Sequence, residues 1–115
     1  RRAYFLCEYI DGHDLGTAWE RQELELSENE IVALFRNLFK IMADYRISHG
    51  DMKATNFLLQ DKKLHVLDLD VMKRNSSKAK FAKMFSKDLL RFRKNWVGTS
   101  MEPEVESLLV EAAKY

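Results

Sequence analysis

The pattern of apolar and polar residues changes period along the chain, and each change marks a predicted element. Residues 3–10, AYFLCEYI, are aromatic and apolar over their whole length, which predicts a buried strand. Apolar runs at 56–60 and 64–68 flank Asp61-Lys62-Lys63, so a β-hairpin is predicted there.

The remaining segments follow helical spacing. Ser27 and Glu30 form a capping box before a helix predicted over 28–46. Its apolar residues predict one core-facing stripe: Ile31, Leu34, Phe35, Leu38, Met42 and Tyr45. Shorter helices are predicted over 14–22 and 86–97, the latter with Leu89, Phe92, Trp96 and Val97 inward. Ser100 is predicted to cap a last helix that runs to Tyr115 and has Pro103 in its first turn. The expected class is α+β, mostly helical with a small hairpin.

Composition limits the class of protein. The chain has 115 residues, of which 46% are hydrophobic, so it can form a single core. It contains no long apolar run and no signal peptide, so we expect a soluble, cytoplasmic protein. A single cysteine, Cys7, argues against both a disulfide scaffold and a cysteine metal site.

Charge is unevenly distributed. The net charge is +1, but nine lysines and arginines and one acid lie between 73 and 94. Such an asymmetry suits an anionic partner, although a solvated basic helix face is the alternative. The expected contacts are Lys73, Arg74, Lys78, Lys80 and Lys83. Nucleic acid is the weaker partner, because the spacing of Phe81, Phe85 and Phe92 fits a buried helix face better than a stacking platform.

Polar residues gather in the loop before the hairpin, HGDMKATN at 49–56. Phosphoryl transfer from a nucleotide requires oxygen ligands for divalent metals and a carboxylate that orients the attacking hydroxyl. Asp51 would be the carboxylate that orients the hydroxyl, and Asn56 and Asp68 would be ligands of the metal. Lys53 would meet the charge of the transferred phosphoryl group.

His49-Gly50-Asp51 followed by Asn56 resembles the catalytic loop of the protein kinase-like superfamily, and residues 66–70 resemble its metal-binding strand end. The resemblance implies a kinase-like C-terminal lobe that uses ATP and Mg²⁺. Residues 8–15 resemble the kinase hinge, which implies that Glu8 and Ile10 contact adenine through their main chain.

The same resemblance implies roles for four further residues. Asp14 would meet the ribose, and His49 would be structural, packing near the metal-binding aspartate. Asp70 would be an additional metal or acceptor contact, or else a turn residue. Asp88 would anchor the backbone of the catalytic loop, or else be an acid stabilised by the dipole in the first turn of its helix.

Gly50 and Asp70 stand where regulated protein kinases have arginine and glycine, which favours small-molecule kinases. Residues 87–96, KDLLRFRKNW, are most similar to the bacterial lipopolysaccharide kinases, which phosphorylate Kdo or heptose of the inner core. Aminoglycoside and choline phosphotransferases are the alternative. A lipopolysaccharide acceptor would bring the basic segment to the cytoplasmic face of the bacterial inner membrane, as a peripheral contact with anionic lipid.

The glycine-rich loop, strand lysine and helix glutamate of a kinase N-terminal lobe are not found in the sequence. We therefore expect a C-terminal lobe from a longer kinase, inactive as the isolated chain. The alternative is a pseudokinase-like module that binds a membrane or another anionic partner without catalysis.

Overall fold

The structure is a computed structural model that describes residues 13–68 and 72–115. The α+β class is confirmed, with helices in the majority and small antiparallel sheets. The helices are α2 (Leu15–Glu20), α3 (Glu28–Tyr45), the 3-10 helix η1 (Ala54–Asn56), α4 (Lys78–Lys94) and α5 (Glu102–Ala112). The strands are β1 (Ile47–Ser48), β2 (Phe57–Gln60), β3 (Lys63–Val66) and β4 (Lys73–Arg74). The strand predicted at 3–10 lies outside the described residues.

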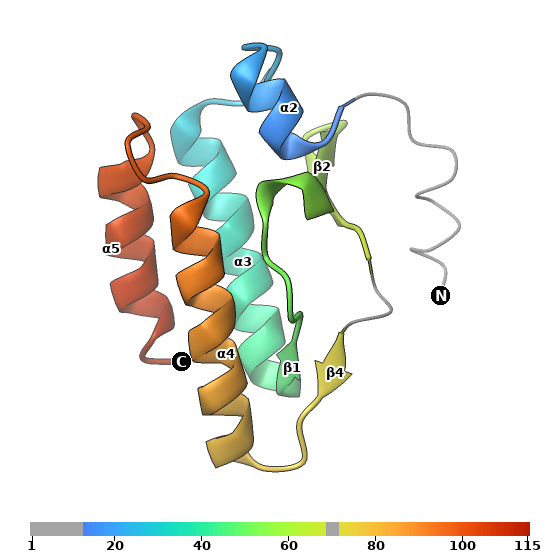
Figure 1. Cartoon of the computed structure of the whole chain (residues 1–115), viewed down its shortest axis with the longest axis vertical. Helices are drawn as coiled ribbons and strands as arrows, with labels where there is room; N and C mark the ends of the chain where they lie inside the picture. Colours follow the sequence, from blue (N-terminus) through green and yellow to red (C-terminus); the bar gives the residue numbers. More distant parts are fainter. Residues whose placement is uncertain (1–12, 69–71) are drawn as a thin grey trace.

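Figure 1 shows how the elements are arranged. Helices α3 and α4 run side by side, and α5 packs against both. Helix α2 lies at one end of the molecule, whereas β1, β4 and the start of α4 lie at the opposite end. Among the helices of the described residues, none combines the length and apolar character needed to cross a membrane.

Both ends of α3 are specified by local sequence. Ser27 Oγ accepts a hydrogen bond from the Glu30 N–H at 3.2 Å, and the Glu30 carboxylate accepts one from the Ser27 N–H at 3.0 Å. The predicted capping box is therefore present, and it satisfies two N–H groups that a helix start would leave unpaired. The helix ends at Tyr45, and its C-cap residue Arg46, whose φ is 56°, turns the chain into β1.

The buried face of α3 differs in part from the predicted stripe. Ile31, Phe35 and Met42 are buried, as predicted. Phe39, which the stripe omitted, has no exposed surface. The prediction was wrong for Tyr45, which is 57% exposed because it is the last residue of the helix, where the chain turns away from the core.

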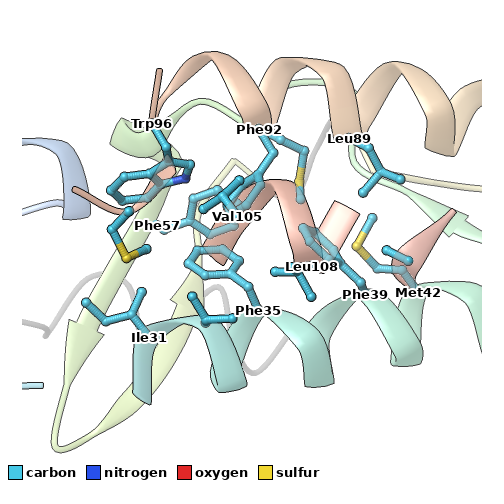
Figure 2. Packing of buried hydrophobic residues seen from close by; sticks show 14 of the residues in the cluster. Ile31, Phe35, Phe39, Met42, Phe57, Leu89, Phe92, Trp96, Val105 and Leu108 are labelled. Atoms are coloured by element: carbon cyan, nitrogen blue, oxygen red, sulfur yellow. The ribbon is translucent and has the colours of Figure 1, made fainter. Parts of the chain in front are cut away.

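Aromatic side chains from α3, β2 and α4 form the centre of the core (Figure 2). The ring centroid of Phe35 lies 4.9 Å from that of Phe57 and 4.6 Å from that of Phe92. Phe39 lies 5.1 Å from Phe92, and Leu108 of α5 belongs to the same cluster. Full burial of one such side chain contributes roughly 1.5–3 kcal/mol, so this cluster fixes the three elements relative to one another.

Helix α4 begins at Lys78, so the predicted start at residue 86 was wrong. Ser77 caps the first turn with its side-chain oxygen, and Phe81 and Phe85 extend the buried face toward the N-terminus. The lysines of these first turns lie on the solvent side. Val97, predicted to face inward, is 57% exposed because α4 has already ended before it.

The hairpin and α5 complete the fold. Strands β2 and β3 pair in antiparallel register through a two-residue turn in which Asp61 and Lys62 have φ values of 53° and 60°. Positive φ at both positions matches the twist of the flanking strands. Ser100 does not cap α5 as predicted: Met101 occupies the N-cap position, and the Ser100 hydroxyl donates to a Glu28 carboxylate oxygen.

Candidate active site

The loop between β1 and η1 is tied to the end of the hairpin by His49. The Asp51 N–H donates to His49 Nδ1 at 3.0 Å, so the ring carries its proton on Nε2. Nε2 lies 3.1 Å from the carbonyl oxygen of Leu67 and donates to it. His49 is 1% exposed, so this contact is shielded from water. The loop therefore lies against the residue that precedes Asp68.

Asn56 makes a second connection. Its Nδ2 donates to the backbone carbonyl oxygen of Asp51 at 2.8 Å, and the backbone carbonyl oxygen of Asn56 accepts from the Leu67 N–H at 2.7 Å. The side chain is 8% exposed, so its orientation is well determined by these neighbours. Because Nδ2 is engaged with Asp51, the Oδ1 atom faces the other way and is the atom left to act as a ligand.

Asp51 and Lys53 form an ion pair at the surface of the loop. Lys53 Nζ lies 3.3 Å from Asp51 Oδ2, and the two side chains are 46% and 34% exposed, respectively. A pair this exposed contributes little to stability. Both groups are therefore accessible to a substrate.

Asp68 follows directly on the hydrogen-bonded Leu67 and is exposed. Its φ is 58°, a left-handed conformation that is uncommon outside glycine but that aspartate adopts more readily than most residues. Leu67 bonds to both His49 and Asn56, so the backbone at Asp68 lies beside the loop.

Asp88 holds the first half of the loop. It is 3% exposed in the middle of α4 and accepts hydrogen bonds from the N–H groups of His49 at 2.7 Å and Gly50 at 2.9 Å. Its position rules out the alternative of an acid in a first helical turn. Burial raises the pKa of the Asp88 carboxyl, and the two N–H donors offset this only in part. The contact fixes Gly50, whose φ is 99°, immediately before Asp51.

Asn95, which the sequence reasoning missed, holds the second half. Its Nδ2 donates to the Met52 carbonyl oxygen at 2.8 Å, and its Oδ1 accepts from the Ala54 N–H at 3.1 Å. Arg91 Nη1 donates to the same Oδ1 at 3.0 Å. Asp88 and Asn95 are two helical turns apart, so they lie on one face of α4 and bond to the loop at two points. The spacing of two helical turns after Asp88 is the sequence signal that could have predicted a loop contact for Asn95.

The expected nucleotide contacts are only partly described. Asp14 caps α2, accepting from the N–H and the hydroxyl of Thr17, both at 2.9 Å. A ribose contact by Asp14 would have to share its carboxylate with this cap. Glu8, Ile10 and Asp70 lie outside the described residues.

The basic residues expected to meet an anionic partner lie on two elements, and those of β4 are next to the start of the loop, because Lys73 pairs with Ser48, the residue before His49. All five are exposed: Lys73, Arg74, Lys78, Lys80 and Lys83. They occupy β4 and the first turns of α4, at the opposite end of that helix from Asn95 (Figure 1). A helix of 17 residues is about 25 Å long, so the lysines at the start of α4 lie far from Asn95 and the part of the loop that it contacts.

The oxygen ligands that Asn56 and Asp68 offer suit magnesium, which does not need a cage made entirely of protein ligands. In the part of the chain that the structure describes, no group of three or more His, Cys, Asp or Glu side chains is placed to hold a metal ion. Mg²⁺ is usually held by one or two carboxylates together with substrate phosphates and water. The amide oxygen of Asn56 and the exposed carboxylate of Asp68 fit such a sparse set of oxygen ligands.

Comparison with protein-family models, curated proteins and solved structures finds no match for this chain.

Proposed function

We propose that this chain is the C-terminal lobe of a protein kinase-like phosphotransferase, which uses ATP and Mg²⁺ to phosphorylate a sugar hydroxyl of the lipopolysaccharide inner core. The observation that carries the proposal is the hydrogen-bond network around Asp51. Asn56 bonds to Asp51, and His49 bonds to the residue before Asp68. These are the residues to which the resemblance gives catalytic, metal-binding and structural roles.

Asp51 would act on the acceptor. Its carboxylate accepts the hydroxyl proton as the hydroxyl oxygen bonds to the γ-phosphorus, while the bond from that phosphorus to the β–γ bridging oxygen breaks and ADP leaves. Lys53, beside Asp51, would offset negative charge on the transferred group. Asn56 and Asp68 would hold Mg²⁺, which when bound neutralises charge on the phosphates.

Rigid support of the loop favours a catalytic role over an ordinary turn. Asp88 and Asn95 between them bond to four backbone groups of the loop, at His49, Gly50, Met52 and Ala54. In-line transfer depends on positioning, and small displacements of a catalytic group reduce the rate strongly.

A non-catalytic module that docks on an anionic surface is the second candidate. The observation that favours it is the exposed basic surface on β4 and α4. Each lysine or arginine near an anionic membrane contributes about 1 kcal/mol, so this surface also suits a kinase whose acceptor is embedded in the inner membrane. An aminoglycoside- or choline-type phosphotransferase would share the loop and differ in acceptor.

The test compares two variants of the protein, each purified from the cells that make it rather than as the isolated 115-residue chain, in the presence of ATP, Mg²⁺ and lipopolysaccharide. Asp51→Asn removes the proton acceptor, so phosphate incorporation should fall at least a hundredfold. Asp44→Asn makes the same change at an exposed site on α3 and should leave the rate unchanged. Equal rates in the two variants would contradict catalysis by Asp51.

The docking candidate is tested separately. The triple variant Lys78→Gln, Lys80→Gln and Lys83→Gln should weaken binding to anionic vesicles, and wild-type binding should fall steeply as salt rises. Vesicle binding by a protein that incorporates no phosphate would favour the docking module.

A further inference from the structure

Buried polar side chains gather around the loop at 49–56. Among residues 13–68 and 72–115, five polar or charged side chains are buried: Ser48, His49, Asn56, Asn75 and Asp88. The bonds of His49, Asn56 and Asp88 are those that hold the loop. Ser48 and Asn75 remain, and they are hydrogen-bonded to each other. Burying a polar group is costly unless it forms hydrogen bonds, so the position of each of these two side chains depends on the other.

Asn75 fastens β4 to β1. Its Nδ2 donates to the backbone carbonyl oxygen of Arg46 and to Ser48 Oγ, both at 3.1 Å. Its backbone N–H donates to the same Arg46 carbonyl oxygen at 2.8 Å. These bonds continue the antiparallel pairing of the two strands, in which Ser48 is opposite Lys73. Figure 1 shows β1 and β4 side by side at one end of the molecule.

Burial distinguishes Asn75 from its neighbours. It is 5% exposed, whereas the other residues from Lys73 to Lys80 are all exposed. Asparagine is common at helix starts because its side chain can cap the first turn. Here Ser77 caps α4, and the amide donors of Asn75 bond to β1 and the residue before it. Asn75 therefore acts on β1 and not on the start of the helix.

The two fastened strands flank the candidate metal site along the chain. Strand β1 leads directly into His49, whose ring bonds to the Leu67 carbonyl oxygen beside Asp68. Strand β4 begins at Lys73, five residues after Asp68, and five residues span at most about 18 Å. Joining β4 to β1 therefore limits where the chain can run as it leaves Asp68, so Asp68 is restrained from both sides.

We infer that Asn75 is a positioning residue for the Mg²⁺ site, acting on Asp68 through the β1–β4 pair. The inference rests on the proposed function, since that is what gives Asp68 its metal. Residues that orient a metal ligand from outside the coordination sphere typically change metal affinity about 10- to 100-fold when they are replaced. Because Asn75 is buried against β1, it supplies no ligand itself.

Metal-dependent nucleotide binding tests the inference without relying on turnover. The protein, purified from the cells that make it, is titrated with ATP by calorimetry, once with Mg²⁺ and once with EDTA. We expect Mg²⁺ to tighten ATP binding by the wild type. Asn75→Ala should raise the Kd for MgATP about tenfold or more and leave the Kd in EDTA unchanged. A variant that only destabilised the fold would not separate the two values.

Asn37→Ala is the matched control, because it makes the same change at an exposed site on α3. Both of its Kd values should equal those of the wild type. Ser48→Ala removes only one bond of Asn75 and should raise the Kd for MgATP by a smaller factor in the same direction. Where Asn75→Ala does not fold, Ser48→Ala decides the outcome.

Three results would each overturn the inference: no effect of Mg²⁺ on the wild type, an unchanged Kd for MgATP in the Asn75 and Ser48 variants, or an equal rise with and without Mg²⁺. Phosphorylation of lipopolysaccharide alongside such a result would leave the proposed function standing. Mg²⁺-dependent binding that requires Asn75, in a protein that incorporates no phosphate, would reject the proposed function and keep the positioning role.

Discussion

Replacing Asp88 by asparagine tests whether α4 holds the loop at 49–56 in place. The carboxylate is 3% exposed and accepts from two backbone N–H groups, at 2.7 and 2.9 Å. Asparagine keeps one acceptor oxygen and turns an NH₂ group toward the other donor. A buried N–H left unpaired costs about 1–3 kcal/mol. Because burial raises the pKa of Asp88, the charge itself costs some stability, and asparagine removes that cost. We therefore expect a net loss of about 1–2 kcal/mol.

The loss can be read from thermal unfolding. A domain of 115 residues has an unfolding entropy near 0.24 kcal/mol/K, so 1 kcal/mol lowers Tm by about 4 °C. Asp88→Asn should lower Tm by about 4–8 °C. It should also speed amide hydrogen exchange at His49 and Gly50, whereas Asp44→Asn, an exposed control, should change neither. Unchanged Tm and unchanged protection of these two amides in Asp88→Asn would refute the anchoring role.

Three further predictions follow from single contacts. Asn95→Ala leaves the Met52 carbonyl and the Ala54 N–H without their partner, so kcat should fall with little change in the KM for ATP, as steady-state kinetics would reveal; an unchanged kcat would contradict a positioning role. The Ser27 N–H holds the pKa of the Glu30 carboxyl below its usual value, so its charge stabilises the fold above the ordinary pKa of about 4.3, and this is lost as pH falls through the lowered pKa. The Tm difference between wild type and Glu30→Gln, which keeps the capping box, should therefore shrink as the pH falls below the ordinary pKa of glutamate. A difference that stays constant with pH would argue against this contribution of the Glu30 charge. Phe35→Ala empties a site with no exposed surface and should cost about 3–5 kcal/mol in chemical denaturation, a loss below 1 kcal/mol being incompatible with the packing described.

Local sequence signals predicted the parts of the fold that depend on neighbouring residues. Ser27 and Glu30 defined the start of α3, and Asp61 and Lys62 marked the hairpin turn. The start of α4 was missed because lysines occupy its solvent side, and the capping oxygen of Ser77 was not recognised. Tyr45 continues the helical period but lies where the core has ended, which periodicity alone does not show.

The candidate site was predictable where its residues lie within one motif. Asp51 and Asn56 are close in sequence, and the contact between them follows from the turn of η1. The roles of α4 were harder to predict because they depend on contacts between residues about forty positions apart. Asp88 came only from the resemblance to kinases, and Asn95 required knowledge of which face of α4 meets the loop.

Phosphoryl transfer by this protein can be observed by ³¹P NMR. The protein, purified from the cells that make it, is incubated with ATP, Mg²⁺ and inner-core lipopolysaccharide. We predict that ADP and a sugar phosphomonoester appear together in equal amounts, and that Asp51→Asn forms neither. A folded protein that yields no phosphomonoester, or an Asp51→Asn variant that yields as much as the wild type, would contradict the account.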